Sequence, residues 1–316
     1  MSEIHVIFGT GPLGQSVMRA LERRGKCVKM VNRSGRRPAD VPAHIQIAGG
    51  DAYNTNFTRA VTRGADVVYQ CAQPEYHRWT QEFPALQAAI LEGAAASGAK
   101  LIAGENLYMY GDTGGKPMHE DLPYAAQTRK GRVRAEMAQA LLEAHREGKV
   151  RTASARGSDF YGPGALSSTL GERTILPLLR GKPAEITIAP DQPHAYTYID
   201  DFGEVLAILG EREEALGQAW HVPNAPELTQ REMLALFFEE AGLEPKYRVM
   251  GKAMLRLGGL FVPAAREMVE MVYEFDQPFR VDAGKFIRAF GDIATPYKKA
   301  VKETVRWYRE TLSSRA

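Results

Sequence analysis

The strongest constraint on this chain is the glycine pattern that follows its first apolar segment. Residues 4–8 read as a short strand, and Gly9, Gly11 and Gly14 then form G-x-G-x-x-G ahead of a helix-like stretch, 15–24. In that setting the glycines permit a tight turn, a pyrophosphate close to the backbone, and close packing of helix on strand. The alternative is a plain glycine turn, but the strand–turn–helix context favours a dinucleotide at the helix N-terminus. The residues assigned to it here are Gly9, Gly11, Pro12, Leu13 and Gly14.

Composition narrows the class of protein. The 316 residues are enough for one large domain or two coupled ones, with ordinary globular values of 44% apolar and 25% charged residues. A net charge of +2 gives no case for nucleic acid or an anionic membrane as a partner, and no apolar run reaches the length of a membrane helix. Cys27 and Cys71, both expected in buried strands, form no disulfide framework, and no spacing suggests a metal site. We expect a cytoplasmic protein without a signal peptide.

Strand-like and helix-like segments alternate through the first half of the chain. Such alternation implies right-handed crossovers and a parallel sheet with helices on both faces. The predicted fold class is therefore α/β, with a Rossmann-type, doubly wound core over 1–157 that binds NAD(P). Prolines and glycines punctuate the rest, so 158–316 is expected to form a smaller, mixed α/β substrate lobe, with a segment near 198–222 returning to the core. The expected strands are 4–8, 27–31, 45–48, 66–71, 100–103 and 150–156, and the main expected helices are 54–63, 79–97 and 128–147.

The end of the second strand bears on which dinucleotide binds. An acidic residue at this place commonly binds the ribose 2′-hydroxyl of NAD, but here the strand ends in Asn32, followed by Arg33 and Ser34. A guanidinium can pair bidentately with a 2′-phosphate, which a carboxylate would repel. NADP(H) is therefore favoured over NAD(H). The alternative for 33–37 is a solvated basic turn. Asp51, after the third strand, is placed to meet the adenine amino group or to cap the helix that starts near Asn54.

Further motifs resemble a known family. They are Cys-Ala-Gln-Pro at 71–74, Tyr-Gly-Asp at 110–112, Glu-Asp-Leu-Pro at 120–123, the turn at 156–164, Tyr-Ile-Asp-Asp-Phe at 198–202, and the stretch 224–232. In this order, over residues 1 to about 235, they resemble the extended short-chain dehydrogenase/reductases, the NAD(P)-dependent epimerase/dehydratase group. The resemblance implies that Ala72 and Gln73 pass the nicotinamide ribose.

The catalytic positions of that family are changed. The family uses a Ser or Thr just before Tyr-Gly, and a Tyr-x-x-x-Lys pair on the following helix, in which the Tyr is the acid/base. This sequence contains no Tyr-x-x-x-Lys. The corresponding residues are Asn106, Thr128 and Arg132. Arg132 keeps a positive charge for ribose or phosphate, and Asn106 can polarise a carbonyl, but a Thr hydroxyl is a far weaker acid than a phenol.

Another residue must supply the proton if the chain is an enzyme. Tyr108 and Tyr124 lie in the right region, with Tyr124 in the loop leading to the helix, although ordinary packing is the favoured role of each. Glu105 is either a desolvated base or, as favoured here, a solvated turn carboxylate. Lys130 is expected at the surface of a helix rich in arginine, and His194 is placed to line a substrate pocket.

Two functions remain open at this point. The first is an NADP(H)-dependent oxidoreductase or epimerase-like enzyme with a small-molecule substrate. The second is a non-catalytic redox sensor or regulatory protein that binds NADP(H) without turnover. The missing Tyr-Lys pair favours this second function. The chain is expected to be a monomer or a homodimer formed through 79–97 and 128–147.

Overall fold

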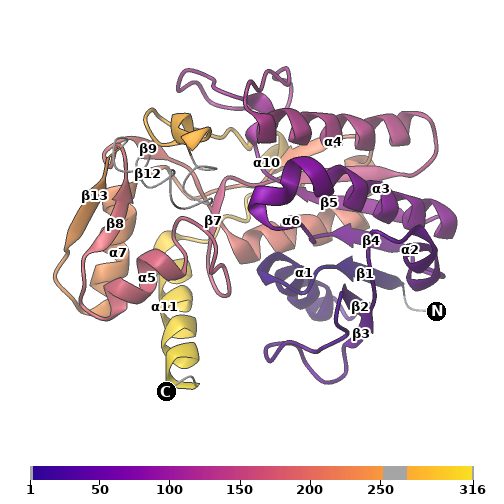
Figure 1. Ribbon diagram of the computed structural model, residues 1–316, viewed down its shortest axis with the longest axis horizontal. Coiled ribbons are helices and arrows are strands. Elements are labelled where there is room, and N and C mark those ends of the chain that lie inside the picture. Colours follow the sequence, from indigo (N-terminus) through magenta and orange to yellow (C-terminus); the bar gives the residue numbers. More distant parts are fainter. Residues whose placement is uncertain (1–2, 252–268, 315–316) are drawn as a thin grey trace. The chain divides into compact units, whose positions relative to one another are not determined.

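The structure is a computed structural model that describes residues 3–251 and 269–314, and it divides into two compact units (Figure 1). The first unit takes the chain up to Met109, Arg129–Gly157 and Phe202–Val222. The second takes Tyr110–Thr128, Ser158–Asp201 and the chain from Pro223 on. The two are described separately below.

One stretch departs from the predicted core of 1–157. Tyr110–Thr128 belongs to the second unit, because Met118 forms a parallel bridge with Val281 and the Gln277 amide donates a hydrogen bond to Asp112. The predicted lobe of 158–316 also contains 252–268 and 315–316, which lie outside the described residues.

A parallel seven-stranded sheet organises the first unit, in the order β11-β6-β5-β4-β1-β2-β3. The chain forms this order because β1 is fully apolar along Val6–Phe8 and is paired on both sides, by β2 and by β4. The last strand in sequence, β11, adds to the edge at β6. The strands are β1 (Ile4–Phe8), β2 (Cys27–Asn32), β3 (Gln46–Gly49), β4 (Val67–Gln70), β5 (Lys100–Glu105), β6 (Thr152–Arg156) and β11 (Ala219–His221).

Helices cover both faces of this sheet. On one face α2 contacts α3 through a hydrogen bond from Thr58 Oγ1 to the Ala89 carbonyl at 2.6 Å, and α3 contacts α4 through Gln87 Nε2 and the Met137 carbonyl at 2.8 Å. The other layer joins α1 to α6, where Gly203 lies against Ser16 so closely that a Cβ would meet its Oγ at 2.1 Å. The helices are α1 (Pro12–Arg23), α2 (Thr55–Val61), α3 (Trp79–Ser97), α4 (Arg129–Arg146) and α6 (Ile199–Glu211).

The second unit is a mixed α/β structure around its own core. Phe237, Phe238 and Tyr308 are buried in that core, and α7 begins at a capping box between Thr229 and Glu232. Three small sheets pair β7 with β10, β9 with β12, and β8 with β13. The strands are β7 (Asp159–Tyr161), β8 (Ala184–Thr187), β9 (Pro193–His194), β10 (Tyr196–Tyr198), β12 (Leu228–Thr229) and β13 (Tyr247–Met250). The helices are α5 (Glu172–Leu179), α7 (Gln230–Ala241), α10 (Gly284–Phe290) and α11 (Tyr297–Ser314).

The two cysteines differ from the prediction that both are buried. Cys27 is exposed because it is the first residue of β2, at the amino edge of the sheet. Cys71 follows β4 and is partly buried, and its burial raises the pKa of the thiol.

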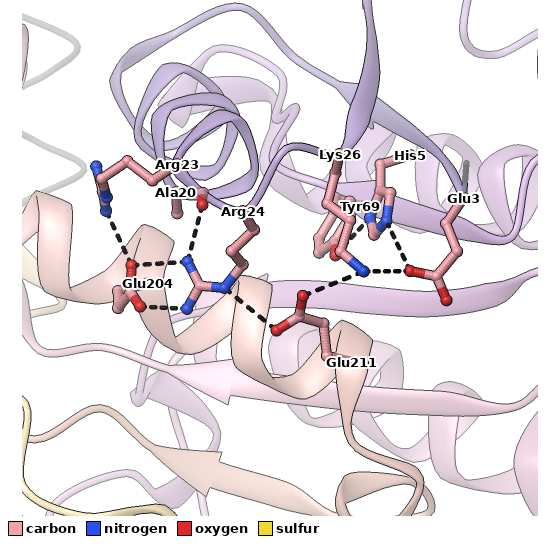
Figure 2. A network of polar contacts seen from close by, with 9 residues as sticks. All are labelled: Glu3, His5, Ala20, Arg23, Arg24, Lys26, Tyr69, Glu204 and Glu211. Atoms are coloured by element: carbon pink, nitrogen blue, oxygen red, sulfur yellow. Dashed lines mark hydrogen bonds and ion pairs between the residues drawn. The ribbon is translucent and has the colours of Figure 1, made fainter.

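An ion-pair network fixes α6 to α1 (Figure 2). Arg24, which ends α1, donates to both Glu204 and Glu211 of α6, at 3.1 Å from Nη1 to Glu204 Oε2 and 3.2 Å from Nε to Glu211 Oε2. The same guanidinium also donates to the Ala20 carbonyl at 2.8 Å. One planar side chain therefore holds the C-terminus of one helix against two carboxylates that lie about two turns apart on another.

Figure 2 shows that the network continues to a buried histidine at the amino edge of the sheet. Lys26 links Glu211 to Glu3, and Glu3 lies 3.7 Å from His5 Nε2. The other ring nitrogen of His5 lies 3.1 Å from the Tyr69 hydroxyl. Burial lowers the pKa of His5, although the Glu3 carboxylate acts in the opposite direction, so the folded protein favours the neutral ring.

This depressed pKa predicts an acid-sensitive stability. Neutral His5 contributes fully above the unfolded-state pKa of about 6.5, and the contribution falls as the pH drops towards the lower folded-state value. Between these values the free energy of unfolding should fall by up to about 1.4 kcal/mol per pH unit from this group. Urea unfolding from pH 8 to pH 5 measures the slope, which His5→Gln should reduce and His119→Gln, in an exposed loop, should leave unchanged. An equal slope in His5→Gln and the parent contradicts the assignment.

Candidate active site

Two of the three glycines in the turn have no room for a side chain, and the third has open space around it. Gly9 has φ +112°, and a Cβ there would lie 2.8 Å from the Ala72 nitrogen. A Cβ on Gly14 would lie 2.1 Å from the Gly9 carbonyl oxygen. A Cβ on Gly11 would meet nothing within 4 Å. Gly9 and Gly14 are thus required by the packing of the chain itself, whereas Gly11 leaves space beside the backbone that a ligand can use.

The helix that follows presents its amino end at this turn. Gly11 is the N-cap of α1 and makes no side-chain capping bond, and Pro12 is the first helical residue. Backbone N–H groups in a first helical turn lack intrahelical partners and carry the positive end of the helix dipole. With no side chain capping them, the N–H groups of Leu13 and Gly14 suit an anion such as a pyrophosphate.

Asn32 organises the loop after β2. Its Oδ1 accepts from the Gly35 nitrogen at 2.7 Å and from Ser34 Oγ at 3.3 Å, and its Nδ2 donates to the Arg36 carbonyl at 2.8 Å and to Thr10 Oγ1 at 3.2 Å. The loop is therefore tied to the glycine turn. Within the described residues the Arg33 side chain makes no hydrogen bond or ion pair, and it is exposed, so its guanidinium is available to a ligand.

The remaining residues assigned to the cofactor follow β3 and β4. Asp51 is exposed, and its Oδ1 accepts from the Tyr53 nitrogen at 3.1 Å. The alternative role of Asp51 as a helix cap is wrong, because Asn54 caps α2 by accepting from the Asn56 and Phe57 nitrogens at 2.9 and 3.3 Å.

Ala72 and Gln73 come directly after β4, with Ala72 against Gly9. Because β4, β1, β2 and β3 are neighbours in a parallel sheet, the segments after these four strands meet at one edge. Ligands of open α/β sheets bind at this carboxyl edge.

A buried ion triad lies at the carboxyl ends of β5 and β6. Glu105 is 3% exposed, and its Oε2 lies 3.1 Å from Arg156 Nε while its Oε1 lies 3.6 Å from Arg134 Nη2 of α4. The Arg134 guanidinium also lies 4.8 Å from the Phe83 ring centre and donates to Met137 Sδ at 3.7 Å. Burial lowers the pKa of Arg134, and the Glu105 carboxylate opposes that shift. The prediction that Glu105 is a solvated turn carboxylate is therefore wrong.

The triad fixes the rotation of α4 about its axis. Lys130 and Arg134, four residues apart, are buried to 1% and 2% exposure. Arg132 lies between them in sequence, about 200° away around the helix, and is exposed. The expectation that Lys130 lies at the surface is wrong, because the face of α4 that Glu105 holds inward is the one that carries Lys130.

Two tyrosines accompany the buried lysine. Lys130 Nζ lies 4.5 Å from the centre of the Tyr76 ring, and the Tyr76 hydroxyl donates to the Tyr108 hydroxyl at 3.5 Å. Asn106, one of the predicted catalytic residues, accepts at Oδ1 from the Tyr108 nitrogen at 3.4 Å and so shapes the turn that carries Tyr108. Sequence reasoning missed Tyr76; the available signal was an aromatic residue shortly after the fourth strand.

Tyr124 and Thr128, also predicted as catalytic, lie in the second unit. Both are partly buried, and the Tyr124 ring packs edge-on against Tyr110 at 6.0 Å between ring centres. Asn106 and Arg132 belong to the first unit.

His194 is also in the second unit, where it is buried rather than open to a pocket. Its Nε2 lies 2.9 Å from Asp159 Oδ2, and its ring stacks on Phe275 and Phe279 at 5.3 and 4.9 Å. Burial is the main cause of a raised pKa at the neighbouring Glu274 carboxyl, and repulsion from Asp159 raises it further. Asp159 is the most exposed member of this group, with 21% of its side chain accessible.

Comparison with known proteins agrees with this geometry. The model of the NAD dependent epimerase/dehydratase family matches residues 4–222, and the chain belongs to that family. It is thus similar to the extended short-chain dehydrogenase/reductases. A search of curated protein sequences gave no match.

Solved structures share the fold over nearly the whole chain. An epimerase from Methanothermobacter thermautotrophicus has a TM-score of 0.83 and 15% identity, covering 99% of this chain and 94% of that one. A dTDP-glucose 4,6-dehydratase from Streptomyces venezuelae with NAD and TYD bound has a TM-score of 0.79 and 17% identity, with 98% of each chain covered. A UDP-glucose 4-epimerase from Thermotoga maritima with UDP-glucose has a TM-score of 0.78 and 17% identity, covering 98% and 99%.

Two kinds of feature are absent from the described part of the chain. Over 3–251 and 269–314, His, Cys, Asp and Glu side chains form no group of three or more that could hold a metal ion. None of the helices described there combines the length and apolar character that crossing a membrane requires.

The triad predicts a large cost for removing its carboxylate. Glu105→Gln leaves two buried guanidiniums without their counter-charge, which should lower the free energy of unfolding by about 3–5 kcal/mol, measured by urea denaturation. Glu213→Gln is the matched control, because Glu213 also pairs with two cations, Lys100 and Arg151, but is 64% exposed. The control should cost about 1 kcal/mol or less. Equal effects of the two substitutions contradict the role of the triad.

Proposed function

We propose that this chain is an NADP(H)-dependent oxidoreductase or epimerase-like enzyme that acts on a small molecule. The observation that carries the proposal is the glycine turn. The packing of the chain leaves no room for a side chain at Gly9 and Gly14, but it leaves space for a ligand beside Gly11. The uncapped amino end of α1 beside it suits the pyrophosphate of a dinucleotide. When bound, the nicotinamide would donate or accept a hydride.

The preference for NADP(H) rests on the loop after β2. Asn32 carries no charge to repel a 2′-phosphate, and it holds a turn that leaves the Arg33 guanidinium exposed. Ser34 adds a hydroxyl in the same turn. Asp51, Ala72 and Gln73 complete the proposed cofactor site, and exposed Arg132 is available to a ribose or phosphate group.

A second candidate function is a sensor that binds NADP(H) without turnover. It is favoured by Thr128, which stands where the related enzymes have a phenol and which is too weak an acid to replace it. We propose a cytoplasmic location for either function, with the protein as a monomer or as a homodimer formed through α3 and α4.

Turnover separates the two candidates. The purified protein is incubated with NADPH and a panel of carbonyl compounds and nucleotide sugars while nicotinamide absorbance is followed. Enzyme function predicts consumption of NADPH with at least one member of the panel. Saturable NADPH binding without turnover on any member supports the sensor.

The two kinds of glycine predict opposite outcomes on substitution. Gly11→Ala, at φ −75° with open space around its Cβ, should change the free energy of unfolding by less than about 1 kcal/mol but weaken NADPH binding at least about tenfold. Gly14→Ala forces a Cβ against the Gly9 carbonyl and should cost about 1–3 kcal/mol of stability. Urea unfolding and NADPH fluorescence titration measure the two effects. Unweakened binding by Gly11→Ala contradicts the proposed site.

The proposed cofactor preference depends on Arg33. Arg33→Ala should weaken NADPH binding by about tenfold and leave NADH binding unchanged, since only NADPH carries the 2′-phosphate. The ratio of the two dissociation constants is the measurement. Arg23→Ala is the control, because Arg23 is an exposed arginine paired with Glu204 in the α1–α6 layer. An unchanged ratio in Arg33→Ala refutes this role of Arg33.

A further inference from the structure

We propose that Tyr108, supported by Tyr76 and Lys130, is the proton-transfer group of this site, in place of the Tyr-x-x-x-Lys pair that the chain lacks. The proposal rests on the proposed function, since it names the acid and base of that reaction. It assigns the acid and its supporting cation to three separate segments instead of one helix: the turn after β4, the turn after β5, and the first turn of α4.

The contacts connect a buried cation to two phenols, through a cation–π contact and then a hydrogen bond. Lys130 Nζ lies over the Tyr76 ring at 4.5 Å, and the Tyr76 hydroxyl donates to the Tyr108 hydroxyl at 3.5 Å. Lys130 is 1% exposed, whereas both tyrosines are partly exposed. The path therefore begins at a buried cation and ends at a phenol within reach of a ligand.

The packing around this path is rigid. Trp79 contacts both tyrosine rings, at 5.0 Å from the centre of the Tyr76 ring and 6.1 Å from that of the Tyr108 ring. Asn106 holds the backbone at Tyr108, and the Glu105–Arg134 contact holds the face of α4 that carries Lys130. A phenol that transfers protons must be held in one position, and these contacts provide that restraint.

The topology of the sheet puts the path at the appropriate end of a dinucleotide. In a doubly wound sheet the two halves each bind one mononucleotide across the carboxyl edge, and β1–β3 form the half that carries the adenosine-binding residues. Tyr76 follows β4 and Tyr108 follows β5, so both lie at the carboxyl edge of the other half. That half receives the nicotinamide ring.

The charges favour proton loss from the phenols. A cation close to a phenol stabilises the phenolate, and its effect is stronger when water is excluded. Lys130 lies over the Tyr76 ring, and the Arg134 guanidinium interacts electrostatically with Tyr108. Glu105 is the carboxylate of this cluster, and Arg134 and Arg156 hold it.

The proton balance of a reduction can be written with these groups. The carbonyl carbon gains a hydride, the electron pair of the C=O bond moves to oxygen, and that oxygen takes the proton of the Tyr108 hydroxyl. Tyr108 is left as a phenolate that interacts with the Arg134 guanidinium and accepts a hydrogen bond from Tyr76, whose ring lies against Lys130. It regains a proton from the Tyr76 hydroxyl, which in turn takes one from solvent. In the oxidative direction the same phenolate accepts the alcohol proton.

Tyrosinate absorbance tests this arrangement without a substrate. Burial raises the pKa of a set of tyrosines outside this cluster: Tyr53, Tyr69, Tyr161, Tyr196, Tyr198, Tyr247, Tyr297 and Tyr308. These tyrosines are therefore expected to contribute little tyrosinate absorbance below pH 10. We expect one tyrosine to ionise below the ordinary value of about 10, and this early component to be absent from Tyr108→Phe.

The cation is tested with a matched pair of variants on one helix. Lys130→Met should move the early component to higher pH, and Arg132→Met, two residues along on the exposed face, should leave it in place. Lys130→Arg, which keeps the charge, should retain it if Lys130→Met fails to fold. The proposal is overturned if no early component exists, if Tyr124→Phe removes it instead, or if Arg132→Met shifts it as much as Lys130→Met.

NADPH binding and turnover separate this proposal from the proposed function. Tyr108→Phe should bind NADPH as the parent does, and on any substrate that the parent turns over it should lower kcat at least about a hundredfold. If the parent binds no NADPH, the proposed function fails whatever the absorbance shows. If Tyr108→Phe retains the parent's kcat, the proposed function stands and this assignment fails.

Discussion

The ion triad of Arg134, Glu105 and Arg156 is the interaction on which the arrangement of the site depends. Glu105 ends β5 and Arg156 ends β6, so the triad ties the carboxyl ends of two neighbouring strands to the first turns of α4. Buried ion pairs of this kind add little net stability, but they penalise every arrangement that separates the charges. The triad therefore determines which face of α4 points inward. As a result Lys130, and not Arg132, lies against the Tyr76 ring.

The glycine turn and the triad occupy the same edge of one parallel sheet. The turn after β1 offers an uncapped helix end and open space at Gly11, and the loop after β2 offers an exposed guanidinium at Arg33. The turns after β4 and β5 bring together two phenols and a buried lysine. A parallel sheet with helical crossovers creates this edge whenever it forms, so the residues of the candidate site come from segments far apart in sequence.

The sequence predicted the framework well and the interior of the site poorly. Apolar strands and glycine-terminated helices have local signals, so β1, α3 and α4 were located to within a residue. The first turns of α4 carry cations at 129, 130, 132 and 134, and no local pattern says which of them is buried. Burial of Lys130 and Arg134 is decided by Glu105 and Phe83, both distant in sequence. The position of Tyr110–Thr128 in the second unit could not be predicted for the same reason. Its pairing partner, Val281, is distant in sequence.

We propose that the carboxyl edge of this sheet holds NADP(H), and the decisive experiment is titration of the purified chain with NADPH and, separately, with NADH, followed by nicotinamide fluorescence. One NADPH should bind per chain, saturably and more tightly than NADH. Saturable binding of neither nucleotide would contradict it.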